Sequence, residues 1–371
     1  MTISLCMIVR NEQEVLARCL ESVQGVADEI IIVDTGSTDA TEEIARRYTE
    51  RVYFFPWQEN FSAARNFSFS KAQKEYCMWM DADDVLEQED REALIRLKAQ
   101  LPQDVDVVMM RYHAAFDEQG RAVFSYYRER IVRNNAEYRW KGRVHEAIEP
   151  KGNVVYSEIA VSHKKTHPGT PGRNLRIYEA QKAAGEAFSP RDEFYYGREL
   201  YYNAKYPQAI HVLSHFLEEG EGWVENNIEA CRTLSLCYQA RGERKKARQA
   251  LFRSLEYGEP RAEICCDIGA LLMEEERYRD AIYWYELALS RKRQDDSGAF
   301  ILPECYGYLP CIQLCVCYDR QGEFQKARDF NEKAGRFKPE SQAYQFNKAY
   351  YQKIFPKPEK NSMHSSAEDG I

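Results

Sequence analysis

Short apolar runs alternate with helical patterns over roughly the first 180 residues of the chain. The runs ISLCMIVR, EIIIVDTGS, RVYFFPW and EYCMWMDADD are apolar at most positions, which predicts four strands. Helical spacing separates them in NEQEVLARCLESV, TDATEEIARRY and FSAARNFSFSKA, with Ser37 or Thr38 as the expected N-cap of the second helix. Near-continuous apolar strands separated by helices are typical of a parallel sheet covered on both faces. The first part of the chain is therefore predicted to be an α/β domain.

A different rhythm begins after about residue 190, where the strands give way to a helical repeat. Its marker is an aromatic or charged residue, two further positions and then an alanine, and the copies contain Ala209, Ala247, Ala281 and Ala327. Ala247 and Ala281 are 34 residues apart, which is the tetratricopeptide period. The longest interval, from Ala281 to Ala327, contains the loop-like insertion RKRQDDSGAFIL. Helix pairs of this kind stack because one pair cannot bury its apolar face alone.

These two sequence patterns, together with the composition of the last residues, predict three parts of the chain. Residues 1–185 form the α/β domain, residues 190–353 form the helical repeat domain, and residues 354–371 form a tail that is polar and contains prolines. We expect the tail to be disordered. A length of 371 residues is too great for one ordinary core and fits two domains.

Composition narrows the class of protein. A hydrophobic content of 44% with 30% charged residues is typical of soluble globular proteins, and a net charge of −8 argues against nucleic acid as a partner. The eleven cysteines are scattered, and Cys6, Cys77 and Cys237 lie inside apolar runs, where a thiol acts as a small hydrophobe. The start of the chain lacks the pattern of a signal peptide, and no segment approaches a membrane span. We therefore expect a cytoplasmic protein.

Three carboxylates, Asp81, Asp83 and Asp84, follow the fourth apolar run directly. Like charges repel one another unless a cation lies among them, and Asp81 and Asp83 could present oxygens to one divalent ion. The alternative is an acidic helix start, because acidic residues stabilise the first turn of a helix.

The first two predicted strands also end in polar residues. Asp34 could accept hydrogen bonds from a nucleoside, and Gly36 would let the backbone approach a ligand closely. Asn11 and Glu12 could bind the same nucleoside or only cap the helix that follows them.

The stretch FSAARN adds Arg65 and Asn66 as candidates for a diphosphate, since a guanidinium suits phosphate. An ordinary amphipathic helix with a solvated arginine is the alternative.

Together, MIVRNE, IIIVDTGSTDAT, FSAARN and MWMDADD resemble the family 2 glycosyltransferases of the GT-A fold. More narrowly, they look like the bacterial branch with a tetratricopeptide tail, which includes the peptide S-glycosyltransferases of the sublancin type. The resemblance covers nearly the whole chain. It implies an α/β, Rossmann-like GT-A domain that binds a nucleotide-sugar, followed by an all-α tetratricopeptide repeat domain.

The resemblance also implies a chemistry: a UDP-sugar donor, Mn²⁺ or Mg²⁺ at the D-x-D motif, and inversion by one in-line displacement. Asp34 would then bind the nucleoside. Asp81, Ala82 and Asp83 would form the D-x-D motif at the diphosphate and metal, with Asp83 favoured as the direct ligand.

An inverting displacement needs a base for the acceptor's proton. Family 2 enzymes usually carry a Glu-Asp type carboxylate well downstream of D-x-D, at a helix start. This chain has no such pair at the expected place and has WKGRVHEAIE instead, which resembles the repeat-bearing branch. Neighbouring side chains in a strand point to opposite faces, so only one of the two candidates should face the site. We favour Glu146 as the base and His145 as a metal or phosphate partner; the exchanged roles and an ordinary strand-loop stay open.

Two further candidates flank the site in sequence. His163 follows an apolar strand and is a candidate third metal ligand, with a surface loop as the equal alternative. Arg130 could meet the diphosphate or lie on a solvated face.

The main functional hypothesis is a metal-dependent inverting hexosyltransferase whose repeats recruit a protein or peptide acceptor. One alternative is transfer to a lipid or lipopolysaccharide-core acceptor. Another is a repeat scaffold whose transferase domain has lost its activity. The sugar, the attacked atom and the oligomeric state stay open, with a homodimer as one candidate.

Overall fold

The computed structural model describes residues 1–117, 120–166, 170–294 and 298–355. The chain divides into two compact units. The first comprises Met1–Gly258 with Gln294–Ile301, and the second comprises Glu259–Arg293 with Leu302–Ile371. Apart from Ile354 and Phe355, the tail that we expect to be disordered lies outside the described residues.

An eight-stranded sheet forms the centre of the amino-terminal part, in the order β3-β2-β1-β4-β7-β6-β10-β5. Its strands are β1 (Ile3–Val9), β2 (Glu29–Asp34), β3 (Val52–Phe54), β4 (Tyr76–Trp79), β5 (Asp84–Val85), β6 (Val107–Phe116), β7 (Ala122–Arg133) and β10 (Val154–His163). The parallel arrangement predicted for the four apolar runs is confirmed, because β3, β2, β1 and β4 are parallel neighbours. The rest of the sheet is mixed, since β7 is antiparallel to both β4 and β6. Consecutive strands with a short connection, such as β6 and β7, must pair in this way.

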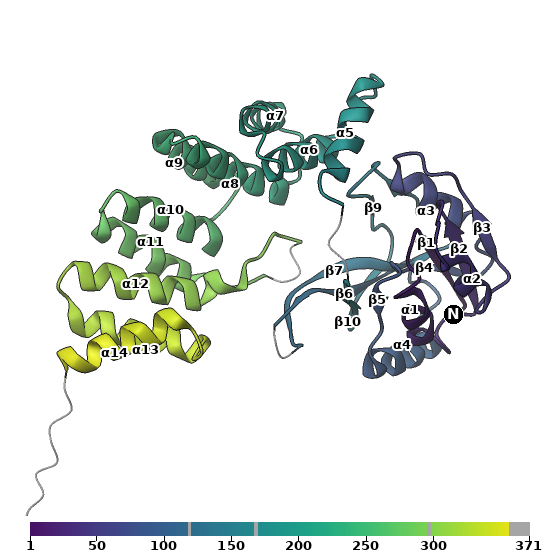
Figure 1. Cartoon of the computed structure of the whole chain (residues 1–371), viewed down its shortest axis with the longest axis horizontal. Coiled ribbons are helices and arrows are strands. Elements are labelled where there is room, and N and C mark those ends of the chain that lie inside the picture. The colour runs from purple at the N-terminus through teal and green to yellow at the C-terminus, as the bar shows by residue number, and fades with distance from the viewer. Residues whose placement is uncertain (118–119, 167–169, 295–297, 356–371) are drawn as a thin grey trace, which may run out of the picture. The chain divides into compact units, whose positions relative to one another are not determined.

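Both faces of the sheet are covered (Figure 1). Apolar residues of β1 alternate, so that Ile3, Leu5 and Met7 pack with the helices α1 (Leu16–Ser22), α2 (Thr41–Arg46) and α4 (Gln88–Gln100). On the opposite face, Cys6 packs in the cluster that contains Phe69 of α3 (Phe61–Phe69) and the short strands β8 (Trp140–Lys141) and β9 (Ala147–Ile148). This is the layered α/β domain that the sequence predicts.

Helices α5 to α14 follow the sheet. In the first unit these are α5 (Arg173–Ala183), α6 (Pro190–Tyr202), α7 (Tyr206–Glu219), α8 (Val224–Ala240) and α9 (Arg244–Arg253). In the second they are α10 (Ala262–Glu274), α11 (Tyr278–Ser290), α12 (Tyr308–Arg320), α13 (Phe324–Phe337) and α14 (Gln342–Ile354). The repeat alanines Ala209, Ala247, Ala281 and Ala327 are each fully buried, on α7, α9, α11 and α13. The helical repeat read from the sequence is therefore present.

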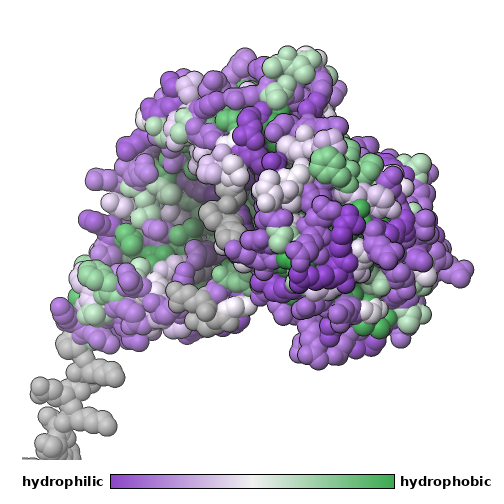
Figure 2. Space-filling view, turned by 45° about the vertical axis from the view of Figure 1, so that its right-hand side comes forward, coloured by the Kyte–Doolittle hydropathy of each residue, from purple (hydrophilic) through white to green (hydrophobic). Residues whose placement is uncertain are grey.

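The burial of the cysteines and the polarity of the surface agree with what the composition predicts. All eleven cysteines are free and buried, as expected of thiols that pack as small hydrophobes. None of the described helices combines the length and apolar character that crossing a bilayer requires. On the face shown in Figure 2, the right-hand part of the molecule is mainly hydrophilic, and its hydrophobic residues form small groups.

Candidate active site

The candidate residues collect where the parallel strands end. Asp34 is the last residue of β2 and pairs in register with Val9, the last residue of β1, while Asp81 follows β4 closely. Because β2, β1 and β4 are parallel neighbours, their carboxyl ends share one edge of the sheet. Ligands of open α/β sheets bind at this edge.

Asp34 is 6% exposed and holds the turn that follows β2. Its Oδ1 accepts hydrogen bonds from the backbone N–H of Gly36 and of Ser37, both at 2.7 Å. Gly36 has φ of 110°, and a side chain there would meet no atom within 4 Å. The glycine is therefore required by the backbone conformation and not by crowding.

Hydrogen bonds of Asn11 and Glu12 link the loop that follows β1 to the loop that follows β2. The Asn11 Oδ1 accepts from the Thr38 N–H at 2.8 Å, and the Ser37 hydroxyl accepts from the Asn11 N–H at 2.9 Å. The Glu12 N–H donates to the Thr41 hydroxyl at 2.7 Å. Ser37 and Thr38 thus serve the loop, and the prediction that one of them caps α2 is wrong: Ala40 occupies the N-cap.

Asp84 is the fully buried member of the acidic cluster. Its Oδ2 accepts from the Asp81 N–H and from Arg130 Nη1, both at 3.1 Å, and its Oδ1 accepts from the Tyr112 hydroxyl at 3.0 Å. Arg130 is also fully buried, with its guanidinium 3.7 Å from the centre of the Trp79 ring. Both sequence hypotheses for Arg130, a diphosphate contact and a solvated position, are wrong, because the side chain neutralises Asp84 inside the sheet.

Asp83, Asp84 and His163 form a group that could hold a metal ion, with one ligand atom from each lying within 4.8 Å of the others. His163 Nδ1 lies 3.4 Å from Asp83 Oδ1 and 3.2 Å from Asp84 Oδ1. Burial alone would lower the pKa of His163, but its hydrogen bonds with Asp83 and Asp84 raise that pKa to about 10.

The donor set fits a divalent ion. The side chains of Asp83 and His163 are 22% and 24% exposed and could bind an ion directly, whereas the buried Asp84 already accepts from Arg130 and Tyr112. Asp84 would instead add negative charge beside the ion. Asp81, the other expected ligand, is not in this group.

Arg65 on α3 joins Asp81 to Glu146. Its Nη2 donates to Asp81 Oδ1 and its Nε donates to Glu146 Oε1, both at 2.7 Å. The side chain is 8% exposed, and its guanidinium lies beside the paired Trp79 and Trp140 rings, 5.1 and 4.8 Å from their centres. Burial alone would raise the pKa of Asp81, but the charge of Arg65 lowers it to about 2. Among the described residues, Arg65 Nη1 is buried without a hydrogen-bond partner.

Asn66 and Ala82 were expected at the donor, but the structure uses their side chains elsewhere. The Asn66 amide donates to the Trp140 carbonyl and accepts from the Trp140 N–H, both at 2.9 Å, and so attaches β8 to α3. Both ends of the Asn66 amide are thereby engaged with the Trp140 backbone. The Ala82 side chain is 4% exposed and packs in the core with Met80 and Leu86.

His145 and Glu146 point to different partners. Glu146 meets Arg65, whereas His145 Nε2 lies 2.8 Å from Glu199 Oε1 on α6. The segment is a bend between β8 and β9 and not a strand, and His145 has φ of 52°. The structure brings Glu146 to the site and does not bring His145 to the metal-binding group.

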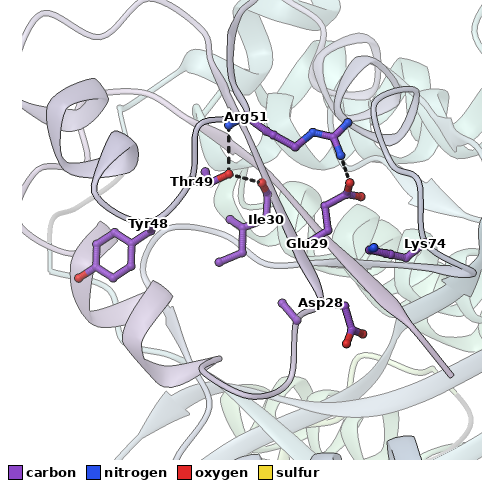
Figure 3. A pocket seen from close by; sticks show the side chains of 8 residues that line it. Asp28, Glu29, Ile30, Tyr48, Thr49, Arg51 and Lys74 are labelled. Atoms are coloured by element: carbon purple, nitrogen blue, oxygen red, sulfur yellow. Dashed lines mark hydrogen bonds and ion pairs between the residues drawn. The ribbon is translucent and has the colours of Figure 1, made fainter.

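A separate polar cavity of about 420 Å³ lies by the amino end of β2 (Figure 3). It is lined by Ala27, Asp28, Glu29, Ile30, Tyr48, Thr49, Arg51 and Lys74. Arg51 forms an ion pair with Glu29, so the facing charges neutralise each other. Asp34, at the other end of β2, is not among its lining residues.

Comparison with known proteins supports a transferase. Residues 4–154 match the family described as Glycosyl transferase family 2. The chain is 36% identical over 149 residues to a TPR repeat-containing protein of Synechococcus elongatus, covering 40% of this chain and 35% of that protein. It is 28% identical over 225 residues to the SPbeta prophage-derived glycosyltransferase SunS of Bacillus subtilis, covering 57% and 52%. It is 31% identical over 160 residues to the lipopolysaccharide core biosynthesis glycosyltransferase LpsC of Rhizobium meliloti, covering 41% and 58%.

Each match spans only about a third to three fifths of the relative's own length. Among solved structures, PilF of Pseudomonas aeruginosa is 18% identical, with a TM-score of 0.39 over 48% of this chain and 74% of that one. The repeat of helix pairs with a buried alanine defines the helical part.

The amino-terminal part of this chain is a family 2 glycosyltransferase domain of the GT-A fold. Tetratricopeptide-type helical repeats follow it.

Proposed function

We propose that the chain transfers a hexose from a UDP-sugar to a protein or peptide acceptor, with inversion and with the help of Mn²⁺ or Mg²⁺. The observation that carries this proposal is Arg65, which holds Asp81 and Glu146 at 2.7 Å each on the ligand-binding edge of the sheet. One buried cation thereby links the D-x-D motif to a carboxylate that can act as a base.

The proposed roles divide along the edge of the sheet. Asp34 and the turn at Gly36 bind the nucleoside, and Asn11 and Glu12 support that turn from β1. Asp83 and His163 would hold the divalent ion, which when bound neutralises charge on the diphosphate. Asp81 keeps its ion pair with Arg65 and lies beside the donor.

Glu146 completes the reaction. The acceptor's hydroxyl or thiol attacks the anomeric carbon, and the bond from that carbon to the diphosphate oxygen breaks with its electron pair going to the leaving diphosphate. The acceptor's proton passes to the Glu146 carboxylate, whose described hydrogen bond to Arg65 uses Oε1. Because the attack is in line with the leaving group, the configuration inverts.

The repeats are proposed to supply the acceptor site, because stacked helix pairs make extended surfaces that suit peptides. We place the boundary between the two domains at residues 185–190, between α5 and α6. Eleven free, buried thiols support a reducing cytoplasm as the compartment.

A lipid or lipopolysaccharide-core acceptor is the second candidate, and the similarity to LpsC favours it. Mass spectrometry after incubation with a panel of UDP-sugars and Mn²⁺ separates the two. A hexose mass increment on peptide or protein acceptors supports the proposal. An increment on core oligosaccharide alone supports the second candidate, and no increment with any donor contradicts both.

A further inference from the structure

The bend at residues 142–146 carries the proposed base and is fastened to α3. The Phe61 N–H at the start of α3 donates to the Arg143 carbonyl at 2.8 Å, and Arg65 one turn later binds Glu146. These contacts with α3 fix the position of the Glu146 carboxylate.

The other side of the bend is fastened to α5 and α6. His145 Nε2 lies 2.8 Å from Glu199 Oε1, and the imidazole stacks on the Tyr195 ring with 4.2 Å between centres and 14° between planes. Arg191 Nε donates to the His145 carbonyl at 3.2 Å. Val144 packs in the same buried cluster as Leu200.

The partner of His145 is itself held in place. Glu199 is 8% exposed, and its Oε1 also accepts from Asn174 Nδ2 at 3.0 Å. A nearly buried carboxylate needs such partners, because an unpaired one is costly. His145 adopts φ of 52°, a conformation that non-glycine residues keep only where surrounding contacts impose it.

We propose that His145 is a positioning residue, whose pair with Glu199 keeps Glu146 on Arg65 and so couples α6, the first helix of the repeats, to the catalytic carboxylate. This rests on the proposed role of Glu146 as the base. It predicts that losing the pair slows the chemical step while leaving donor binding intact, since Asp34 ends β2 and Asp83 lies on the turn between β4 and β5. An acceptor that binds α6 would change the rate of transfer through the same contacts, from Glu199 through His145 to Glu146.

Three variants of the full-length chain test the coupling. His145→Asn removes the ring and suits a positive φ, because asparagine tolerates that region. Glu199→Ala removes the partner, and Glu199→Gln keeps an oxygen that can accept from both His145 and Asn174. Glu193→Gln is the matched control, because Glu193 lies on the same helix and pairs with His215 at 2.6 Å, away from the bend.

We expect His145→Asn and Glu199→Ala each to lower kcat for transfer by roughly 10- to 100-fold, with the donor KM and UDP affinity within about twofold of the wild type. Glu199→Gln should restore most of the rate, and combining His145→Asn with Glu199→Ala should cost little more than either alone. Circular dichroism and thermal melting establish folding. If Glu199→Ala does not fold, His145→Asn and Glu199→Gln still decide the question.

A wild-type kcat in folded His145→Asn would overturn the coupling, as would equal losses of kcat and UDP affinity. The variant Glu146→Gln distinguishes a failure of the coupling from a failure of the proposed function. If Glu146→Gln is fully active, the base assignment fails; if it is inactive while His145→Asn is fully active, only the coupling fails.

Discussion

Arg65 and Glu146 lie 81 positions apart in the sequence and form an ion pair with 2.7 Å between Nε and Oε1. The same guanidinium binds Asp81, and its pKa stays above the ordinary range because the charges of Asp81 and Glu146 outweigh the effect of burial. Arg65 is therefore a permanent cation between Asp81 of the D-x-D motif and Glu146, the proposed base. Five predictions concern this site and the elements that support it.

The first prediction is that Glu146→Gln abolishes transfer while leaving the donor site in place. Glutamine keeps the size of the side chain and an oxygen for Arg65, but it cannot take the acceptor's proton. Loss of a general base costs roughly 10²- to 10⁴-fold in rate. Initial rates of transfer and calorimetry of UDP binding measure the two quantities.

The control for this variant is Glu186→Gln, because Glu186 pairs with Arg143 in the same bend and is more exposed than Glu146. It should transfer sugar at close to the wild-type rate. Equal rates for Glu146→Gln and the wild type would remove Glu146 from the mechanism.

The second prediction is that Asp83→Ala removes the dependence of UDP binding on Mn²⁺ or Mg²⁺. Asp83 is the partly exposed carboxylate of the group with Asp84 and His163. In the wild type, the metal should tighten UDP binding by on the order of tenfold or more, since an ion held there would neutralise charge on the phosphates. Calorimetry with and without metal gives the four affinities.

Asp329→Ala, at an exposed position of α13, serves as the matched control and should keep the metal effect. If the four affinities of wild type and Asp83→Ala are equal, the metal assignment is wrong.

The ligand-binding edge of the sheet could be predicted from the sequence, because polar residues that follow an apolar run are a local feature of the chain. Asp34 and Asp81 each follow an apolar run directly, so the strand pattern alone places both at the carboxyl ends of strands. In the sheet these strands, β2 and β4, lie on either side of β1. His163 follows an apolar run in the same way; it is the last residue of β10, and the structure brings it to Asp83. The pattern of polar residues after apolar runs therefore predicts the positions that the backbone fixes.

Side-chain partners across the fold could not be predicted in the same way. Arg130 reads as a surface arginine, yet a register of β7 against β4 places it beside Asp84 in the interior. Asn66 reads as a phosphate contact, but its amide meets the backbone of Trp140, 74 positions away. These pairings depend on tertiary register, which local periodicity does not encode.

The third prediction concerns the buried pair of Arg130 and Asp84, both with fully buried side chains. Arg130→Met removes the buried guanidinium that pairs with Asp84, and breaking a buried pair by removing one partner costs about 3–5 kcal/mol. A loss of this size lowers the melting temperature by on the order of 10 °C for a domain of this class. Differential scanning calorimetry measures it.

Glu42→Gln is the comparison variant, because Glu42 forms an exposed ion pair with Arg46 at 2.7 Å. Exposed pairs contribute about 0–1 kcal/mol, so this variant should melt close to the wild type. A shift for Arg130→Met no larger than that of Glu42→Gln would show that the buried pair does not support the sheet.

The fourth prediction is a dependence of stability on pH through Glu129. Burial alone would raise the pKa of Glu129, but the Arg128 charge and the Ile148 N–H outweigh it and lower that pKa. A lowered pKa in the folded state means that the unfolded state binds more protons, so the contribution to stability is complete above the unfolded value of about 4.3. It is lost as the pH falls through the lower, folded pKa.

Glu129→Gln should therefore lower the free energy of unfolding at neutral pH, and its difference from the wild type should narrow below about pH 4. Urea unfolding followed by tryptophan fluorescence at several pH values measures the difference. Glu340→Gln, at an exposed position before α14, provides the reference curve. A difference that is constant over the whole acid range would contradict the assignment.

The fifth prediction concerns the insertion between α11 and α12, part of which belongs to the first unit. Phe300 packs in the cluster with Phe194 of α6, and the Arg198 guanidinium lies 4.2 Å from the centre of its ring. Residues 295–297 of the insertion lie outside the described part of the chain. Insertions between stacked repeats often lie on the binding face, so we expect this segment to contact the acceptor.

Phe300→Ala and Lys292→Ala should each raise the KM for a protein acceptor by roughly tenfold, because energy from a remote contact affects only the substrate that makes it. Hydrolysis of the UDP-sugar by water needs only the donor site and the metal, so its slow rate should stay within about twofold of the wild type. Tyr156→Ala, which removes an aromatic side chain that is 57% exposed on β10, should change neither quantity. Steady-state transfer and release of free sugar, measured on the same preparations, give both rates. If the insertion variants lose hydrolysis and transfer in parallel, the repeats support the transferase domain structurally and do not recruit the acceptor.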